Sequence, residues 1–243
     1  MKSKRVLITG GGSGIGLATA KRLRDDGYDV VISGRSKARL DRAGFESVVM
    51  DVTDEASVNS AFAQIGGVDI LINNAGNVKT APLLKTSLSD WSDMLNVNLT
   101  GAFLCAKAAI PHMVDKGWGR FIVIASTSSV KAYPYTGAYA SAKHGVLGLV
   151  KTLALELAKT GVTSNAVCPG FTQTDILSRS VDNIVDKTGR SPEEALKALV
   201  KDNPMKRAID PSEIAHAVAW LLDDRSASMN GVMLPVDGGE LIS

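Results

Sequence analysis

Cysteine is scarce in this sequence of 243 residues. Cys105 and Cys168 are its only two, and neither stands in a CxxC or CxxH spacing. A disulfide framework is therefore excluded, and two reduced, buried thiols are expected. The three histidines, His112, His144 and His216, lie far apart and form no HxxxH or HExxH pattern. We predict no metal site, because neither residue type is grouped as a metal requires.

The sequence also lacks an excess of charge and a long hydrophobic run. Its 27 Lys and Arg against 25 Asp and Glu give a formal charge of +2, too little for a strong basic field that would attract nucleic acid. No uninterrupted apolar run approaches the roughly 20 residues that a membrane helix needs. Residues 1–9 lack the apolar core of a signal peptide. We predict a cytoplasmic protein with neither a nucleic-acid nor a membrane partner.

What the sequence does have is a regular alternation of short apolar runs and helical patterns. The hydrophobic content of 45% is enough to build a core and excludes a disordered chain. Strands are expected at residues 6–9, 30–33, 47–50, 69–73, 121–124, 162–167 and 232–236, and the main helices at 14–26, 55–65, 90–116, 137–159 and 211–222. Continuous apolar strands alternating with helices indicate a parallel sheet covered on both faces. The fold class is therefore α/β, with residues 1–243 in a single domain.

Two local features refine this topology. Pro235 lies in the last expected strand, and a proline favours the edge of a sheet because it cannot donate a ladder hydrogen bond. Residues 172–204 form a long polar region, with a helical pattern only at 191–200. An insertion of this length in an α/β protein is more often a lid than a disordered tether.

A glycine-rich turn follows the first expected strand and opens a helix. Its sequence is Thr9-Gly10-Gly11-Gly12-Ser13-Gly14-Ile15-Gly16. Glycine allows a tight turn and a close approach of the backbone to a pyrophosphate, whose charge is stabilised at the helix N-terminus. This context predicts dinucleotide binding, against the alternative of a plain strand–helix turn. The predicted contacts are Gly10, Gly12, Ser13, Gly14, Ile15 and Gly16.

The ends of the next strands carry further candidate cofactor contacts. No acidic residue follows the second strand, where many dinucleotide proteins bind the ribose 2′-hydroxyl; Arg35 stands there instead. A guanidinium suits a 2′-phosphate, which favours NADP over NAD; the alternative is an ordinary exposed arginine. The other candidates at carboxyl ends of strands are Asp51, Val52, Asn74, Ala75 and Gly76.

The sharpest motif is Tyr139-Ala140-Ser141-Ala142-Lys143, which lies within a helical pattern. Residues i and i+4 share a helix face, so the phenol and the ammonium point the same way. A nearby cation stabilises a phenolate and lowers its pKa from about 10. The pair can therefore exchange a proton with a carbonyl or an alcohol. Ser126, 13 residues before Tyr139 and at the end of the fifth strand, could offer a hydroxyl to the same substrate oxygen, but the run Ser126-Thr127-Ser128-Ser129 leaves the choice of hydroxyl open.

Together these motifs resemble the short-chain dehydrogenase/reductase family, in the branch with TGxxxGxG and YxxxK. The resemblance runs from residue 4 to residue 239 and includes NNAG at residues 73–76 and Pro169-Gly170. It implies a Rossmann fold with a doubly wound, seven-stranded parallel sheet. Within the family, the sequence is similar to 3-oxoacyl (β-ketoacyl) reductases, polyketide ketoreductases and hydroxybutyrate-type dehydrogenases.

The resemblance also implies roles for individual residues. Tyr139 would be the general acid/base, and Lys143 would bind the nicotinamide ribose and lower the Tyr139 pKa. Ser126 would orient the carbonyl, and Asn98 would hold a water for proton relay, unless its amide is simply satisfied by backbone. The nicotinamide carboxamide would be held by Pro169, Gly170, Thr172 and Thr174. The substrate would contact Ser126, Ser128, Tyr133 and Tyr139, beneath a lid at about residues 172–204.

The function expected from these features is NADP-dependent interconversion of a carbonyl and a secondary alcohol by hydride transfer. Ser13 stands where NADP-dependent members often have a basic residue, so NADP(H) preference depends on Arg35, and NAD(H) is the alternative. An NAD-linked alcohol, polyol or hydroxy-acid dehydrogenase is the alternative enzyme. A non-catalytic NADP-binding sensor has little support, because Asn98, Ser126, Tyr139 and Lys143 are all present. The family habit implies a homotetramer, or a homodimer.

Overall fold

The computed structural model describes residues 3–243; residues 1 and 2, where the segment tested for a signal peptide begins, lie outside the described residues. Its strands are β1 (Arg5–Thr9), β2 (Asp29–Gly34), β3 (Glu46–Val49), β4 (Ile70–Asn73), β5 (Gly119–Ile124), β6 (Val162–Pro169) and β7 (Met233–Val236). They form one parallel sheet in the order β3-β2-β1-β4-β5-β6-β7. The predicted seven-stranded parallel sheet is confirmed, and Pro235 lies in an edge strand as expected.

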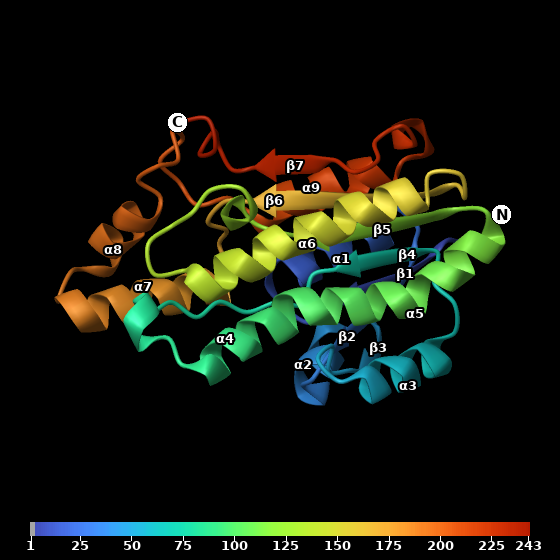
Figure 1. Cartoon of the computed structure of the whole chain (residues 1–243), viewed down its shortest axis with the longest axis horizontal. Helices are drawn as coiled ribbons and strands as arrows, with labels where there is room; N and C mark the ends of the chain where they lie inside the picture. The colour runs from blue at the N-terminus through green and yellow to red at the C-terminus, as the bar shows by residue number, and fades with distance from the viewer. Residues whose placement is uncertain (1–2) are drawn as a thin grey trace.

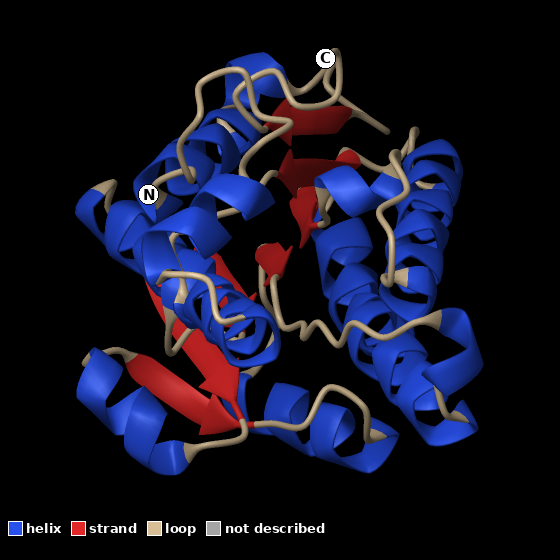
Figure 2. Ribbon diagram, turned by 90° about the vertical axis from the view of Figure 1, so that its left-hand side faces the viewer, coloured by secondary structure: helices blue, strands red, loops and turns tan. Residues whose placement is uncertain are grey.

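Helices cover both faces of the sheet (Figure 2). One face carries α1 (Gly14–Asp25) and α9 (Pro211–Leu222), and the short α2 (Lys37–Ala43) joins β2 to β3. The other face carries α3 (Glu55–Ile65), α5 (Gly101–Lys116) and α6 (Gly137–Glu156). Successive residues of β1 show why: Leu7 packs into the core on the α5 side, whereas Val6 and Ile8 pack on the α1 side. Side chains alternate along a strand, so a sheet buried on both faces needs continuous apolar runs.

A continuous helical stretch runs from α4 (Leu88–Leu95) through a π-helical turn (Asn96–Thr100) into α5. By length and composition alone, residues 88–116 could cross a membrane. The prediction that no stretch is long enough considered only uninterrupted apolar runs, and this helix is the exception among residues 3–243. Its small and apolar residues Ala102, Cys105, Ala109 and Met113 are buried in the core beside the sheet. The buried core helix of a soluble protein can have the same length and apolar composition as a membrane-spanning helix.

Residues 172–204 are more ordered than their composition predicts. They contain α7 (Asp175–Thr188) as well as α8 (Pro192–Leu199), whereas the sequence pattern predicted only the second. In α7 an apolar stripe of Leu177, Val181, Ile184 and Val185 has helical spacing but stands among polar residues, and only Leu177 is buried, in a small cluster with Val200 and Ala208. Both helices lie beyond the carboxyl ends of the strands (Figure 1), where a lid over the sheet edge would stand.

The strand order reverses between β1 and β4. The connection after β1 leads to one side of the sheet, and that after β4 to the other. Such a switch point leaves a crevice at the carboxyl ends of the strands, where ligands of open α/β sheets bind. The glycine-rich turn follows β1 and the NNAG segment follows β4, so both predicted motifs meet at this point.

Candidate active site

The glycine-rich turn between β1 and α1 is held closely against the end of β4. Gly10 and Gly14 have φ of 64° and 52°, in the left-handed region that favours glycine. A Cβ on Gly16 would lie 2.5 Å from Asn74 Nδ2 and 2.6 Å from the Gly10 carbonyl oxygen. The Ser13 side chain makes no capping hydrogen bond among the described residues. The first N–H groups of α1 thus face the crevice as a site for a phosphate.

Asn74, which follows β4, is hydrogen-bonded to the turn that follows β1 and so connects the two segments at the switch point. Its Nδ2 donates to the carbonyl oxygens of Thr9 at 2.9 Å and Gly10 at 3.2 Å. The Thr9 hydroxyl accepts from the backbone N–H groups of Asn74 at 3.0 Å and Ala75 at 2.9 Å. Thr9 was not among the predicted site residues. Its place at the start of the TGxxxGxG motif is the signal that could have identified it.

Two arginines lie beside the crevice at the end of β2. Arg35 is exposed, and its charge contributes to lowering the pKa of the Asp51 carboxyl, after the hydrogen bond from the backbone N–H of Thr53. Arg39 packs over the glycine-rich turn: a Cβ on Gly12 would lie 3.2 Å from its Cγ. Arg39 is thus a second cation beside the glycine-rich turn.

Ser126 and Tyr139 come together at the end of β5. The Ser126 Oγ accepts a hydrogen bond from the backbone N–H of Ser128 at 3.1 Å. Burial raises the pKa of Tyr139, and a hydrogen bond from Ser126 opposes that rise. Both side chains are half-buried. A hydroxyl and a phenol thus lie together at the carboxyl edge of the sheet.

Lys143 is placed differently from what its spacing to Tyr139 suggests. Its Nζ donates to the carbonyl oxygen of Ile124 at 2.9 Å and lies 5.8 Å from the centre of the Tyr139 ring. Burial lowers the pKa of Lys143 to about 8. The expected lowering of the Tyr139 pKa is not found in this arrangement, because burial dominates that residue. The four-residue spacing predicts that Tyr139 and Lys143 lie on one helix face, but it does not predict where the long lysine side chain places its ammonium group.

Asn98 lies in the π-helical turn, a local widening of a helix that often marks functional sites. Its Nδ2 donates to the carbonyl oxygens of Asn77 and Met94, both at 3.0 Å, and its Oδ1 accepts from the backbone N–H of Asn77 at 3.3 Å. A Cβ on Gly76 would lie 2.8 Å from Asn98 Oδ1 and 3.8 Å from Lys143 Nζ. Asn98 is thus close to Lys143, with backbone partners for its own amide.

The turn after β6 lies at the same carboxyl edge of the sheet and packs against the end of β7. The backbone N–H of Gly170 donates to the Val236 carbonyl oxygen at 3.1 Å, and the Thr172 hydroxyl donates to the Gly170 carbonyl oxygen at 2.9 Å. Thr174 is the N-cap of α7, and a Cβ on Gly14 would lie 3.1 Å from its Cγ2. The predicted nicotinamide turn and the glycine-rich turn therefore touch, although 160 residues separate Gly14 and Thr174 (174 − 14).

The two remaining predicted substrate residues are less accessible than expected. Ser128 is buried. The Tyr133 hydroxyl donates to a carboxylate oxygen of Glu240, so it is already engaged. Glu240 was not predicted, and no local pattern marks it, because its partner lies 107 residues earlier in the chain.

This geometry agrees with the comparisons with known proteins. The family model described as enoyl-(acyl carrier protein) reductase matches residues 10–240. D-β-hydroxybutyrate dehydrogenase of Rhizobium meliloti is 34% identical over 98% of both chains. The 3-oxoacyl-[acyl-carrier-protein] reductase MabA of Mycobacterium bovis is 36% identical over 98% of this chain and 92% of its own. A crystal structure of an actinorhodin polyketide ketoreductase variant with NADPH superposes with a TM-score of 0.91, 34% identity and coverage of 99% and 98%.

The fold and the site define an oxidoreductase of the Rossmann class that acts on carbonyl and alcohol groups. The chain belongs to the short-chain dehydrogenase/reductase family, as the motifs predicted.

Proposed function

We propose that this chain is an NADP(H)-dependent reductase that converts a 3-oxoacyl thioester, a β-keto ester or a small ketone to the corresponding secondary alcohol. The observation that carries the proposal is the meeting of Ser126, Tyr139 and Lys143 with the glycine-rich turn at one edge of the sheet. Proton donors and a phosphate site within one crevice are what hydride transfer to a carbonyl requires. The names of the relatives support the substrate class.

The residues of the crevice fit a nicotinamide dinucleotide. A Cβ on Gly16 would clash with Asn74 and with the Gly10 carbonyl oxygen, so glycine lets the first turn of α1 pack closely here, and its N-terminal N–H groups suit a pyrophosphate. When bound, the cofactor supplies or accepts the hydride. We assign Arg35 to the 2′-phosphate, and Asp51 and Val52 to the adenine side. Asn74, Ala75 and Gly76 would line the middle, and Pro169, Gly170, Thr172 and Thr174 the nicotinamide end.

The chain's own contribution is the handling of the substrate oxygen. Ser126 would donate a hydrogen bond to the carbonyl oxygen and so stabilise the charge that develops there. Tyr139 would give its phenolic proton to the same oxygen. Lys143 would bind the nicotinamide ribose. Together with Asn98, it would also conduct to Tyr139 the proton that replaces the one given to the substrate. α7 and α8, at residues 172–204, would exclude water as a lid.

Incubation with acetoacetyl thioester should show the proposed preference for cofactor. The wild-type protein is expected to oxidise NADPH much faster than NADH, measured by the loss of absorbance of the reduced nicotinamide. Arg35→Gln should raise the KM for NADPH by roughly 10- to 100-fold, because a charge-assisted hydrogen bond to phosphate contributes about 1.5–3 kcal/mol. Its KM for NADH should stay within about twofold, since NADH has no 2′-phosphate.

The outcome also separates the two candidate enzymes. An NAD-linked dehydrogenase of a hydroxy acid is the second candidate, favoured by the 34% identity to D-β-hydroxybutyrate dehydrogenase. That candidate would oxidise 3-hydroxybutyrate with NAD, and Arg35→Gln would leave its activity unchanged. Binding of NADPH with no turnover of ketones, sugars or alcohols would instead support the non-catalytic sensor.

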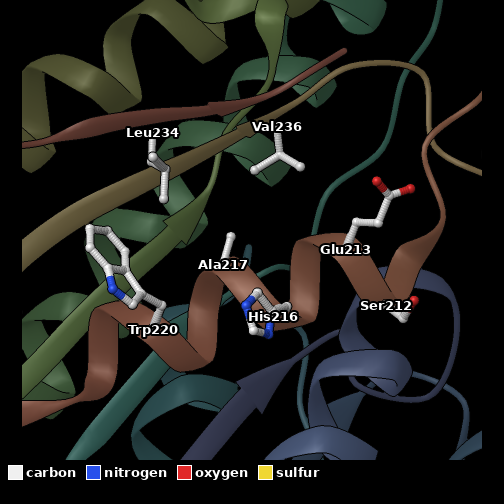
Figure 3. A pocket seen from close by; sticks show the side chains of 7 residues that line it. All are labelled: Ser212, Glu213, His216, Ala217, Trp220, Leu234 and Val236. Carbon is white, nitrogen blue, oxygen red and sulfur yellow. The ribbon is translucent and has the colours of Figure 1, made fainter. Parts of the chain in front are cut away.

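We further propose a cytoplasmic homotetramer, with a homodimer as its building unit. The buried free thiols Cys105 and Cys168 agree with a reducing compartment. β7 is an edge strand, and Leu234 and Val236 from it face Ala217 and Trp220 of α9 across a shallow groove (Figure 3). An exposed tryptophan beside half-buried apolar residues at a sheet edge suits a two-fold contact with a second copy. The second two-fold contact would use α4, α5 and α6.

Ala217→Arg should split the tetramer into dimers, because it places two charges at an apolar two-fold contact. Light scattering on a size-exclusion column measures the mass directly. Leu84→Arg is the matched control, since Leu84 is exposed and lies outside both proposed contacts. A wild-type protein that elutes as a monomer would refute the oligomer without affecting the proposed chemistry.

A further inference from the structure

Glu240 is a carboxylate that folds back into the molecule after β7. Its side chain is only 2% exposed. Asp237 fixes the turn that brings it there: its two carboxylate oxygens accept from the backbone N–H groups of Gly239 and Leu241, each at 2.9 Å. Gly238 and Gly239 have φ of 65° and 90°, which an L-residue with a side chain rarely adopts. The local backbone is therefore built to direct Glu240 inward.

The carboxylate of Glu240 lies between two segments of the active site. Its Oε1 accepts the hydrogen bond from the Tyr133 hydroxyl. Its Oε2 is buried without a hydrogen-bond partner among the described residues, and a Cβ on Gly170 would lie 2.9 Å from it. The Glu240 carbonyl oxygen accepts from Lys131 Nζ at 3.3 Å. Residues 131–133 and the Pro169-Gly170 turn thus both contact Glu240.

The segment that Tyr133 belongs to connects the two proposed proton donors. It begins after the 3-10 turn Thr127–Ser129, which Ser126 caps, and ends where α6 begins at Gly137, two residues before Tyr139. The Thr136 hydroxyl donates to the Tyr133 carbonyl oxygen at 2.8 Å, so the Tyr133 position is transmitted to the start of α6. Anything that fixes Tyr133 therefore restricts the loop between Ser126 and Tyr139.

We propose that Glu240 is a positioning residue that fastens the 130–136 loop to the Pro169-Gly170 turn and so shapes the substrate side of the site. The inference rests on the proposed function, because it concerns the same Ser126 and Tyr139. Glu240 touches neither residue; it acts through Tyr133. Burying a carboxylate is costly, and the hydrogen bond from Tyr133 with the lysine at its backbone offsets part of that cost.

The charges around Glu240 define how its effect depends on pH. Asp237, Asp202, Lys131 and Tyr133 are the ionisable groups that face it, and burial, as the largest influence, raises its pKa. The folded protein then binds a proton at a higher pH than the unfolded chain does. The contribution of Glu240 to the free energy of unfolding is therefore fully present at low pH, and it is lost as the pH rises through the raised pKa. Glu240→Gln should remove that loss while keeping an acceptor for Tyr133.

The test compares Tyr133→Phe, Glu240→Ala and the double variant with the wild-type protein. Each single change should raise the KM for acetoacetyl thioester about tenfold, with kcat within about threefold and the KM for NADPH unchanged. The double variant should be no worse than either single one by more than about twofold, because both remove the same contact. Glu240→Gln should restore a KM near that of the wild type. Tyr28→Phe, a half-buried tyrosine before β2, is the matched control.

Hydrogen–deuterium exchange separates this inference from the proposed function. Amides of residues 130–137 should exchange faster in Tyr133→Phe and Glu240→Ala than in the wild type, with peptides outside this loop, the Pro169-Gly170 turn and the segment around Glu240 unchanged. This readout needs no substrate, so it stays informative even if no ketone is reduced. Additive effects in the double variant, or unchanged exchange in residues 130–137, would overturn the proposal. Faster exchange throughout the chain would also overturn it, because Glu240 would then stabilise the whole fold.

Discussion

Tyr139→Phe is expected to lower kcat for ketone reduction by about 10²–10⁴-fold, the range that a positioned general acid contributes. Phenylalanine keeps the ring that fills the half-buried position and removes only the hydroxyl beside Ser126. The fold and the glycine-rich turn are untouched, so the affinity for NADPH should change by less than about threefold. Stopped-flow measurement of a single turnover, together with NADPH fluorescence titration, separates the two quantities.

Two further variants give the prediction its controls. Ser126→Ala should lower kcat by roughly 10²-fold or more, as removal of one donor to a developing oxyanion does. Tyr28→Phe should leave kcat unchanged, because Tyr28 lies before β2, at the opposite end of the sheet. If Tyr139→Phe retained more than a tenth of the wild-type kcat, Tyr139 would not be the proton donor, and another hydroxyl of the 126–129 segment would have to be tested.

The fold was predictable because its signals are local. The buried positions of β1 and β2 are apolar except for Thr9 and Ser33 at their carboxyl ends, and the glycine-rich turn follows β1 directly in the chain. The strand boundaries consequently agree to within a few residues. α7 escaped prediction although Leu177, Val181, Ile184 and Val185 recur at helical spacing. The polar residues between them dominate the composition of residues 172–204 and hid this apolar stripe.

The site was predictable in its residue types but not in its contacts. Tyr139 and Lys143 share a helix face, as four-residue spacing requires, yet Lys143 Nζ extends to the Ile124 carbonyl oxygen. The contact of Thr174 with Gly14 and that of Glu240 with Tyr133 join residues more than 100 positions apart. Such pairs are set by how the sheet brings the strand ends together, and no local spacing encodes them.

Lys143→Met should abolish ketone reduction and at the same time change how stability depends on pH. The pKa of Lys143 falls from 10.5 to about 8 because its ammonium is buried. Between these values the unfolded chain binds more protons than the folded one, so the stability of the wild type rises as the pH rises from about 8 to about 10. A shift of 10.5 − 8 = 2.5 corresponds to about 3 kcal/mol at most. Methionine carries no charge and has no such dependence.

Urea unfolding of both proteins at pH 7, 8, 9 and 10 measures the effect. At pH 7 the wild type and Lys143→Met should be of similar stability. Methionine avoids the cost of burying a charge, and this gain offsets the lost hydrogen bond to Ile124, which contributes about 1–3 kcal/mol. At pH 10 the wild type should be more stable by roughly 2 kcal/mol, since the hydrogen bond remains and the buried charge is largely gone. Lys151→Met, an exposed lysine on the same helix, should show no such pH dependence.

A difference that stays constant with pH would mean that Lys143 keeps an ordinary pKa in the folded protein. Its burial would then be offset by interactions that this arrangement does not contain. If the difference grows with pH while Lys143→Met is inactive, the lysine gives the fold no gain in stability over methionine at neutral pH. The lysine would then be present for the chemistry of the site, since a methionine would serve the fold equally well at neutral pH.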